Sequence, residues 1–382
     1  MSANRTSTEP VSVMLLFSQA WDIGGAKTHI ETLVQQLRKM GKRVIVVGND
    51  EKIVKQFSDI PTYCINYRSP NPLAIIRNYR LLKSLIKKHH VQVIHAHQRT
   101  ACAYAWLLMK RLNIPYTITF HDKWRRLHRI YKFVLPNQSV AISQGVKDHI
   151  VQLFKLKDTQ VEIVENGVQI EEKTFNNDHV ANSVRQKTRI LHATRFDAKK
   201  TPIILLLCDS ISRLTTKFPD LELIIAGDGK LRDTVEEKAR DTNTKCGRNI
   251  IRCIGPCNDV TSLVKDMDIA VGTGRFALEA MAAGKPVVAI ANGNDFPGII
   301  TPNNWHIASL TSWTRGNKII AEDTLTSEIE KLLSDPALLH SLGEFGQNIV
   351  RRQFSAEIMT TRLCNLYSVI IANASRNLNK NK

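Results

Sequence analysis

The chain has 382 residues, 43% of them hydrophobic, and a formal net charge of +18. This length predicts roughly two domains, and the composition is that of an ordinary soluble globular protein. The sequence has no apolar run near the ~18 residues that cross a bilayer, and the short apolar run at 11–17 fits a first strand better than a signal peptide. Seven scattered cysteines, an odd number, indicate reduced thiols. We therefore expect a cytoplasmic protein.

The positive charge is concentrated in the N-terminal part. Residues 1–150 carry 23 Lys and Arg against 8 Asp and Glu, a net charge of +15, which leaves +3 for the rest. Solvated surface lysines are the plain explanation. The functional alternatives are an anionic membrane surface, a polyanionic acceptor and nucleic acid.

Short apolar runs alternate with longer amphipathic segments in the first part of the chain. The predicted strands are 12–17, 43–47, 91–95, 116–120, 139–142 and 161–164. The predicted helices are 28–40, 72–89 and 101–112. This alternation predicts a doubly wound parallel sheet.

The alternation stops at residues 169–187, which are polar and predict a linker between domains. It then restarts, with a helix that ends near residue 218. The predicted strands are 190–193, 221–226, 250–254, 269–271, 287–290 and 306–310. Residues 322–371 are largely helical in pattern, and the polar tail 373–382 is expected to be disordered. The sequence thus predicts two Rossmann-like domains, 1–180 and 181–353, with ligand sites where strands end in a shared cleft.

Glycines mark two of the expected strand-to-helix turns. Gly24 and Gly25 follow the first strand and precede the helix 28–40. Glycine there lets the backbone approach a ligand, and a helix N-terminus favours anions. Gly227 and Gly229 follow the strand 221–226, where plain turn chemistry explains them equally well.

The stretch 272–290 is the most informative part of the sequence. A loop of Gly272, Thr273 and Gly274 opens a short helical run that carries one acid, Glu279, and leads into the strand 287–290. In a parallel sheet, this order directs backbone N–H groups at a bound anion and places one carboxylate beside it. Such a carboxylate usually contacts hydroxyl groups, as a ribose diol is held in dinucleotide folds.

Two cations follow the first strand of the second domain. Arg195 and Lys200 lie in the loop after residues 190–193, and we expect them to point towards Gly272–Glu279. A guanidinium and an ammonium can hold a diphosphate and stabilise its charge as a leaving group. The alternative is a pair of exposed loop cations.

Histidines and acids offer weaker signals. His121 ends the strand 116–120 and is either structural or a hydrogen-bonding or acid–base group, whereas His95 and His97 are expected to be structural. Asp266 and Asp268 form a DxD pattern, but it leads into a strand instead of ending one, so we expect a structural role. No other cluster has metal-ligand spacing, and no metal is expected.

A basic amphipathic segment follows His121. Read as an α-helix, residues 122–134 carry an apolar face of Trp124, Leu127, Ile130, Tyr131 and Val134. Its cations lie largely on the other faces: Lys123, Arg125, Arg126, Arg129 and Lys132. Such a segment can lie on anionic lipid or contact an acceptor. The alternative is that its apolar stripe packs on its own sheet.

Taken together, these motifs resemble glycosyltransferase family 4, whose GT-B architecture is α/β with two Rossmann-like doubly wound domains facing a central cleft. The resemblance runs from about residue 12 to 367. It rests on the order and spacing of GGAKTHIETLVQQLRKMGKRVIVV (24–47), VQVIHAH (91–97), TFHD around His121, VAISQGVKDHI (140–150), VEIVENGV (161–168), TRFDAKK (194–200), LIIAGDGKLR (223–232), ALEAMAAGKPVVA (277–289) and LLSDPALLHSLGEFGQNIV (332–350).

The resemblance implies transfer of a sugar from a nucleotide diphosphate sugar, with retention of anomeric configuration and without a metal or other cofactor. It assigns the diphosphate to Arg195 and Lys200, the donor ribose to Glu279 and the donor sugar to His121. Gly24 and Gly25 would shape the floor of the site. It also implies that the final segment, 354–382, crosses back to the N-terminal domain.

One departure from the family pattern concerns the donor. The family usually carries two glutamates separated by seven residues; Glu279 matches the second, and Val271 stands in place of the first. Arg195 is likewise preceded by Thr194 instead of glycine. Backbone amides of Gly272–Gly274 are a hypothetical substitute for the missing acid.

The expected function is therefore glycosyl transfer to a sugar or lipid-linked acceptor in cell-envelope or polysaccharide synthesis. Peripheral contact with the inner face of the cytoplasmic membrane is expected through Arg125, Arg126, Arg129 and Lys132, and no specific nucleic acid is expected. The alternatives are a sugar-nucleotide isomerase or hydrolase of the same fold, and a non-catalytic protein that binds sugar nucleotides or polyanions.

Overall fold

The computed structural model describes residues 11–19, 25–170, 187–257, 259–291, 295–316, 318–319 and 321–380. The chain forms two compact units: residues 1–22, 26–165 and 357–382 make unit 1, and residues 23–25 and 166–356 make unit 2. Unit 2 begins earlier in the sequence than the expected boundary at 180. Most of the expected linker, 171–186, lies outside the described residues.

Unit 1 is built on a parallel seven-stranded sheet with the order β3-β2-β1-β4-β5-β6-β7. Its strands are β1 (Ser12–Phe17), β2 (Arg43–Gly48), β3 (Thr62–Cys64), β4 (Val93–His97), β5 (Tyr116–Phe120), β6 (Ser139–Ala141) and β7 (Val161–Ile163). The sequence predicted all of these except the edge strand β3. The central strands β1, β4 and β5 are buried along their full length.

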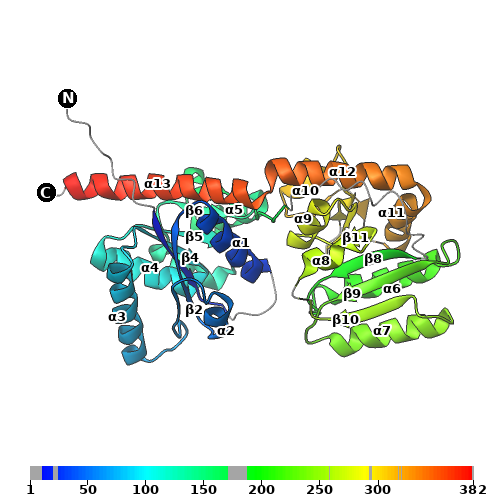
Figure 1. Ribbon diagram of the computed structural model, residues 1–382, viewed down its shortest axis with the longest axis horizontal. Coiled ribbons are helices and arrows are strands. Elements are labelled where there is room, and N and C mark those ends of the chain that lie inside the picture. Colours follow the sequence, from blue (N-terminus) through cyan, green and yellow to red (C-terminus); the bar gives the residue numbers. More distant parts are fainter. Residues whose placement is uncertain are drawn as a thin grey trace. The chain divides into compact units, whose positions relative to one another are not determined.

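Helices cover both faces of this sheet (Figure 1). They are α1 (Gly25–Lys39), α2 (Lys52–Gln56), α3 (Pro72–Lys88), α4 (Arg99–Leu112), α5 (Gln144–Phe154) and α13 (Ala356–Lys380), with the short 3₁₀ helices η1 (Arg126–Val134) and η2 (Asp158–Gln160). The apolar faces of α3, α4 and α5 pack on one side of the sheet, and those of α1 and α13 pack on the other. In α1 this face is Ile30, Leu33, Val34 and Leu37, the helical spacing expected from the sequence.

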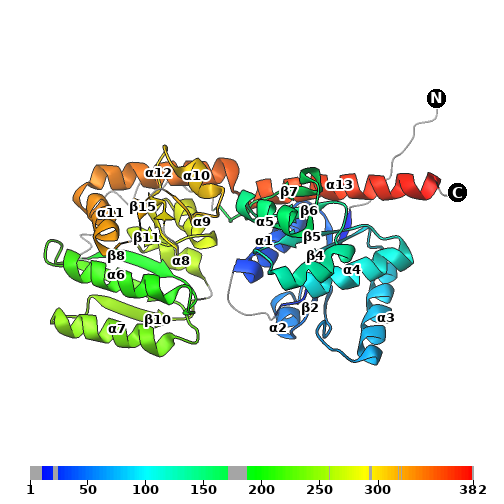
Figure 2. The same cartoon turned by 180° about the vertical axis from the view of Figure 1, so that it is seen from behind.

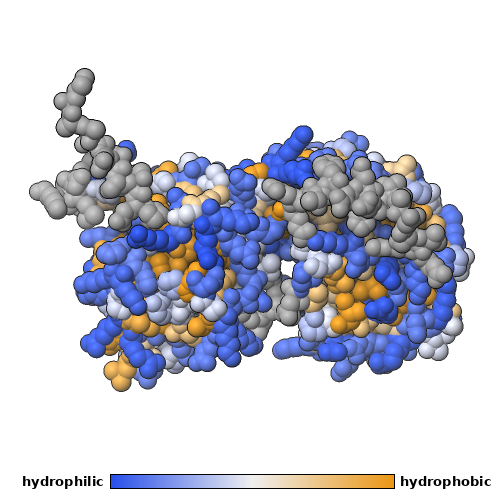
Figure 3. All heavy atoms as spheres, in the orientation of Figure 1, coloured by the Kyte–Doolittle hydropathy of each residue, from blue (hydrophilic) through white to orange (hydrophobic). Residues whose placement is uncertain are grey.

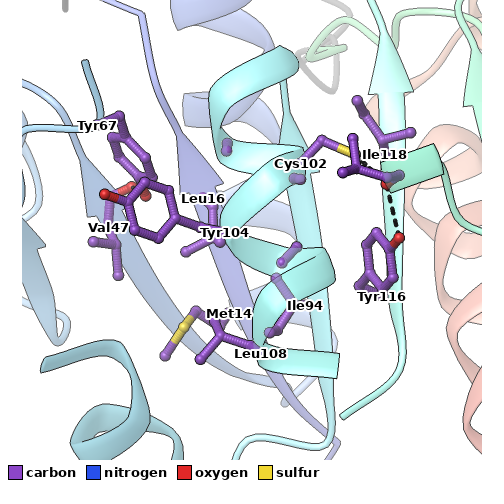
Figure 4. Packing of buried hydrophobic residues seen from close by; sticks show 14 of the residues in the cluster. Met14, Leu16, Val47, Tyr67, Ile94, Cys102, Tyr104, Leu108, Tyr116 and Ile118 are labelled. Carbon is purple, nitrogen blue, oxygen red and sulfur yellow. Dashed lines mark hydrogen bonds between the residues drawn. The ribbon is translucent and has the colours of Figure 1, made fainter. Parts of the chain in front are cut away.

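The packing of α4 on the sheet also fixes the end of η1. Figure 4 shows Tyr104 beside Tyr67 on one side of α4 and Cys102 facing β5 on the other. The Cys102 thiol and the Tyr116 hydroxyl both donate to the carbonyl of Val134, over 3.1 and 2.8 Å. The last residue of η1 is therefore tied to the core.

Unit 2 contains a six-stranded sheet with the order β10-β9-β8-β11-β12-β14. Its strands are β8 (Thr188–Ala193), β9 (Leu221–Ala226), β10 (Ile251–Gly255), β11 (Ile269–Val271), β12 (Val287–Ala289) and β14 (Gly298–Ile299), and β13 (Asp295–Phe296) pairs with β15 (Lys318–Ile319) in a small second sheet. The neighbours are parallel except for β14, which runs antiparallel to β12. The prediction of two α/β domains with parallel sheets is confirmed.

Helices also flank the sheet of unit 2, as Figure 2 shows from behind. They are α6 (Thr201–Leu214), α7 (Arg232–Lys245), α8 (Val260–Lys265), α9 (Arg275–Ala282), α10 (Trp305–Ser309), α11 (Glu322–Ser334) and α12 (Pro336–Gln353). The helices α6, α7 and α11 share one core with the sheet, and α8, α9 and α12 share another. The predicted strand at 306–310 was wrong. Residues 305–309 form the short helix α10, in which Ala308 is the buried residue.

The chain enters and leaves unit 2 at neighbouring points. The backbone N–H of Val168 donates to the carbonyl of Phe354 (3.0 Å), and the N–H of Ala356 donates to the carbonyl of Val168 (2.9 Å). The next helix, α13, packs in unit 1, where the Tyr367 hydroxyl lies 2.7 Å from Nδ1 of His95.

The expected disorder of the polar tail was wrong as far as Lys380, because α13 continues to that residue. No glycine or proline interrupts the sequence from Ala356 to Lys380. Figure 3 shows a largely hydrophilic face with separate hydrophobic areas on each unit. Among the described residues, no helix combines the length and apolar character needed to cross a bilayer.

Candidate active site

A pocket in unit 2 lies where the sheet changes its winding direction. From β8 the chain passes to β9 on one side, and later returns to β11 on the other. In open α/β sheets, ligands bind in the crevice at the carboxyl ends of such a strand pair. A pocket occupies this place, with a volume of about 30 Å³, room for a couple of water molecules. It is lined by His192, Ala193, Thr194, Lys200, Ile203, Gly272, Thr273 and Ile290.

The loop from β8 to α6 holds Lys200 at this pocket. Oδ1 of Asp197 accepts the backbone N–H groups of Lys199 (2.9 Å) and Lys200 (3.0 Å), which closes the turn before α6. Burial lowers the pKa of Lys200; Asp197 opposes this shift, while Arg195 and Lys199 add to it. Arg195 is exposed on the same loop and does not line the pocket.

The glycine loop contributes Gly272 and Thr273 to the same pocket, but not Gly274. The amide of Gly272 donates to the carbonyl of Val288, and that of Gly274 to the carbonyl of Ser312, both over 3.0 Å. Both of these amides are thus engaged within the protein, and the hypothesis that backbone amides of Gly272–Gly274 replace the missing acid stays a prediction that depends on Thr273. The Thr273 amide has no hydrogen-bond partner among the residues described, and Thr273 lines the pocket.

Glu279 lies inside α9 and is paired with Arg275. The Nε of Arg275 donates to Oε1 of Glu279 over 2.8 Å, and both side chains are about one-tenth exposed. Another guanidinium nitrogen, Nη1, donates to the carbonyl of Gly167 (2.9 Å), in the segment that enters unit 2. Burial raises the pKa of Glu279, and Arg275 counteracts the shift. Glu279 is not in the lining of the pocket.

His192 is a pocket residue that the sequence did not suggest. Its Nδ1 lies 2.7 Å from the carbonyl oxygen of Val271, so Nδ1 carries the proton and donates it. Its Nε2 is buried and has no hydrogen-bond partner among the described residues. Burial lowers the pKa of His192 to about 4, so Nε2 is an acceptor at neutral pH. The only sequence signal was a histidine in the middle of an apolar strand.

Unit 1 has its own change of winding direction, between β1 and β4, and histidines gather there. His29 of α1, His97 at the end of β4 and His121 after β5 bring one ring nitrogen each to within 4.8 Å of one another. His97 Nδ1 and His121 Nε2 are 3.0 Å apart. His97 is thus part of a cluster and not only a structural residue as expected, whereas His95 is held by Tyr367 and Thr119.

The three clustered imidazoles form a polar patch, and at least two of the rings are neutral at pH 7. Burial lowers the pKa of His121 to about 4 and that of His97 well below its usual value, the latter with added repulsion from neighbouring histidines. Neutral imidazoles can hydrogen-bond to sugar hydroxyls, and three of them could also hold a Zn²⁺ ion. No metal was expected here, because residues 29, 97 and 121 show no ligand spacing in the sequence.

The remaining predicted residues are placed as follows. Gly25 is the exposed first residue of α1, and Gly24 lies outside the described residues. The basic segment is a 3₁₀ helix, η1, not an α-helix. Trp124 and Val134 are buried but Leu127 and Ile130 are 66% exposed, so the alternative in which the whole apolar stripe packs on its own sheet is wrong. Arg125, Arg126, Arg129 and Lys132 are all exposed.

Replacing Gly227 with alanine is expected to destabilise unit 2 by about 3 kcal/mol and to weaken ligand binding. Gly227 has φ +155°, and a Cβ there would lie 1.9 Å from the carbonyl oxygen of Thr194. Thr194 directly precedes Arg195 in the chain. Urea unfolding measures the loss. Gly247→Ala is the control, because Gly247 has φ +66° but open space around it, so about 1 kcal/mol is expected. Equal losses in both variants would contradict the steric explanation.

Acid is expected to destabilise the fold below about pH 6.5. The pKa values of His95 and His192, about 3 and about 4, lie below those of the unfolded chain because both rings are buried. Between pH 6.5 and 4 the unfolded chain binds more protons, so the free energy of unfolding falls as pH falls, by up to about 1.4 kcal/mol per pH unit for each histidine. Denaturant unfolding at pH 7.5, 6.0 and 5.0 measures this slope. His192→Phe should reduce it, and a matched change of the exposed His340 to Phe should not.

Comparison with known proteins agrees with this geometry. The sequence profile of Glycosyltransferase Family 4 matches residues 23–172, and that of Glycosyl transferases group 1 matches residues 174–349. A phosphatidyl-myo-inositol mannosyltransferase of Mycolicibacterium smegmatis is 24% identical over 291 residues, 70% of this chain and 72% of the relative.

Solved structures share the fold over almost the full length. A glycosyltransferase of Rickettsia africae has a TM-score of 0.76 at 20% identity, covering 95% of this chain and 99% of that one. Anabaena Alr3699/HepE in complex with UDP has a TM-score of 0.71 at 17% identity, covering 93% and 99%. Because the two profiles follow each other along both units and these structures share the arrangement of sheets and helices, the chain is a family 4-like glycosyltransferase with the GT-B fold.

Proposed function

We propose that this glycosyltransferase uses a nucleotide diphosphate sugar and transfers the sugar, with retention and without a metal ion, to a sugar or lipid-linked acceptor of the cell envelope. The observation that carries the donor class is the pocket of unit 2. There Lys200, which is half-buried, and Thr273 both line the pocket at the change of winding direction. A fixed cation and a backbone N–H are the groups that bind a diphosphate and stabilise its charge as it leaves.

The relatives support the same donor and acceptor classes. Anabaena Alr3699/HepE has been solved with UDP and with UDP-glucose. The M. smegmatis relative is named for mannosyl transfer to a phosphatidylinositol. In this chain we assign the leaving diphosphate to Lys200 and Arg195, the donor ribose to Glu279 and the donor sugar to His121.

The donor is tested by titrating the protein with UDP, GDP, ADP and their sugars in a thermal-shift screen, followed by calorimetry. A ligand that binds only the native state stabilises it, by about 2.7 kcal/mol at a ligand concentration 100 times the Kd. The melting temperature rises accordingly. The best donor is then incubated with and without lipid extract. Transfer only with the acceptor supports the proposal, and release of free sugar or an isomer from the donor alone at the same rate contradicts it.

The stereochemistry and the metal requirement are tested on the same reaction. The anomeric proton of the product, followed by NMR, should keep the configuration of the donor. The rate in excess EDTA should equal the untreated rate, because Lys200 and Arg195 supply the positive charge. Loss of activity in EDTA that zinc restores would reject metal independence and direct attention to His29, His97 and His121.

A further inference from the structure

The 3₁₀ helix η1 separates its side chains into three rows. With 3.0 residues per turn, residues at i, i+3 and i+6 lie above one another. His128, Tyr131 and Val134 form the inward row, and each is partly or fully buried. The second row is apolar and the third is basic. A nine-residue 3₁₀ helix is unusually long, so this separation is sustained over the whole segment.

The apolar row points away from the core. Leu127, Ile130 and Phe133 are 66%, 66% and 70% exposed, and they are three of the largest apolar exposures in the described part of the chain. At about 2 Å of rise per residue, the row extends about 12 Å. One edge of Phe133 contacts the Trp106 ring, with centroids 5.9 Å apart. The row is therefore a presented apolar ridge and not part of a core.

The basic row lies directly beside this ridge. Arg126, Arg129 and Lys132 repeat with the same spacing, and all three are exposed. They belong to the part of the chain that carries a net charge of +15. An apolar ridge flanked by cations is complementary to a bilayer with anionic headgroups, in which the apolar side chains enter the acyl boundary and the cations stay among the phosphates.

The ridge is held rigidly from beneath. Trp124, just before η1, packs edge-to-face against Phe120, Tyr131 and Phe154. Its carbonyl oxygen lies 2.6 Å from Nε2 of His149. At the other end of η1, the carbonyl of Val134 accepts the hydrogen bonds of Cys102 and Tyr116. Because both ends are fixed, the ridge needs no reordering before it binds.

We propose that η1 docks this protein on an anionic membrane, with Leu127, Ile130 and Phe133 inserted and Arg126, Arg129 and Lys132 on the headgroups. This deepens the proposed function, because it names the surface that brings the enzyme to a lipid-linked acceptor. Binding to vesicles is measured without nucleotide sugar, so its failure is distinct from failure of the donor assignment.

The test is sedimentation of the full chain with sucrose-loaded vesicles of phosphatidylcholine with 30% phosphatidylglycerol, and with phosphatidylcholine alone. The wild type should pellet with the anionic vesicles. Leu127→Ser/Ile130→Ser/Phe133→Ser should weaken the partition constant at least about 100-fold. Arg126→Gln/Arg129→Gln/Lys132→Gln should weaken it about fivefold per cation. Both variants should retain the wild-type melting temperature, since the changed side chains are exposed.

A matched variant on α3 controls for general loss of apolar surface. Leu73, Ile75 and Ile76 are 74%, 39% and 46% exposed in the same unit, and their triple serine variant should bind vesicles as the wild type does. Equal binding to neutral vesicles, wild-type binding by the η1 serine variant, or loss only in the α3 variant would each overturn the proposal. So would binding to a soluble polyanion such as heparin without binding to vesicles.

A second measurement does not depend on loss of binding. Phe133→Trp places a fluorophore in the ridge. The emission of this added tryptophan, obtained by subtracting the wild-type spectrum, should shift to the blue on anionic vesicles. Brominated acyl chains should quench this added emission. An unshifted and unquenched emission on pelleted vesicles would show that the ridge stays in water and would overturn its insertion.

Discussion

Replacing Glu279 with alanine is expected to lower the free energy of unfolding of unit 2 by about 3–5 kcal/mol, and not only to weaken donor binding. The reason is Arg275, which is only 9% exposed and keeps its charge when its carboxylate partner is removed. The same guanidinium holds the carbonyl of Gly167 where the chain enters unit 2. If the Arg275 side chain moves after Glu279 is removed, the segment around Gly167 is disturbed as well. Urea unfolding of the purified variant measures the effect.

A double variant separates stability from binding. Arg275→Met with Glu279→Gln removes both charges of the pair and should regain the part of the lost stability that comes from breaking the pair, while the hydrogen bond to Gly167 is lost. If Glu279 holds the donor ribose, the double variant remains folded but binds the nucleotide diphosphate at least about tenfold more weakly in calorimetry. Wild-type affinity of the folded double variant would show that Glu279 serves only to hold Arg275.

Replacing Lys200 with methionine is expected to reduce kcat about 100- to 1,000-fold with little change in stability. Lys200 lines the pocket, and its burial already lowers its pKa, so removal of the charge relieves a desolvation cost in the free protein. Its positive charge becomes most favourable when the diphosphate departs. The loss should therefore appear in kcat with a smaller change in KM.

Lys199 provides the matched control. It is exposed on the same loop and carries the same charge, but it does not line the pocket. Lys199→Met should therefore keep kcat within about twofold of the wild type, because salt screens the effect of an exposed charge. A loss of the same size in both variants would mean that the loop acts through its overall charge, and the assignment of Lys200 to the leaving group would fail.

Strand–helix alternation was enough to predict both parallel sheets. Buried strands such as β1 and β9 are short, mostly apolar runs, and their spacing leaves room for helical crossovers. The convergence of Lys200 with Gly272 and Thr273 was also predictable, because each follows the carboxyl end of a strand and such ends meet at one edge of the sheet.

The errors arose where tertiary packing overrides a local pattern. An α-helical period groups Leu127 and Ile130 with Tyr131, but η1 is a 3₁₀ helix, and tertiary hydrogen bonds hold its ends at Trp124 and Val134. Likewise, nothing local suggested that Nε2 of His192 would lie in a pocket with no hydrogen-bond partner from the described part of the chain.

The sequence by itself determined the two sheets, the loops that carry the chemistry and the family, because periodicity and turn residues act over short distances. Outside that pocket, the tertiary structure decided which residues from distant segments meet. It joined His29, His97 and His121 from separate elements, and it brought Arg275 to the carbonyl of Gly167, 108 residues away. Long-range contacts of this kind depend on strand order and side-chain direction, and neither can be read from residue spacing.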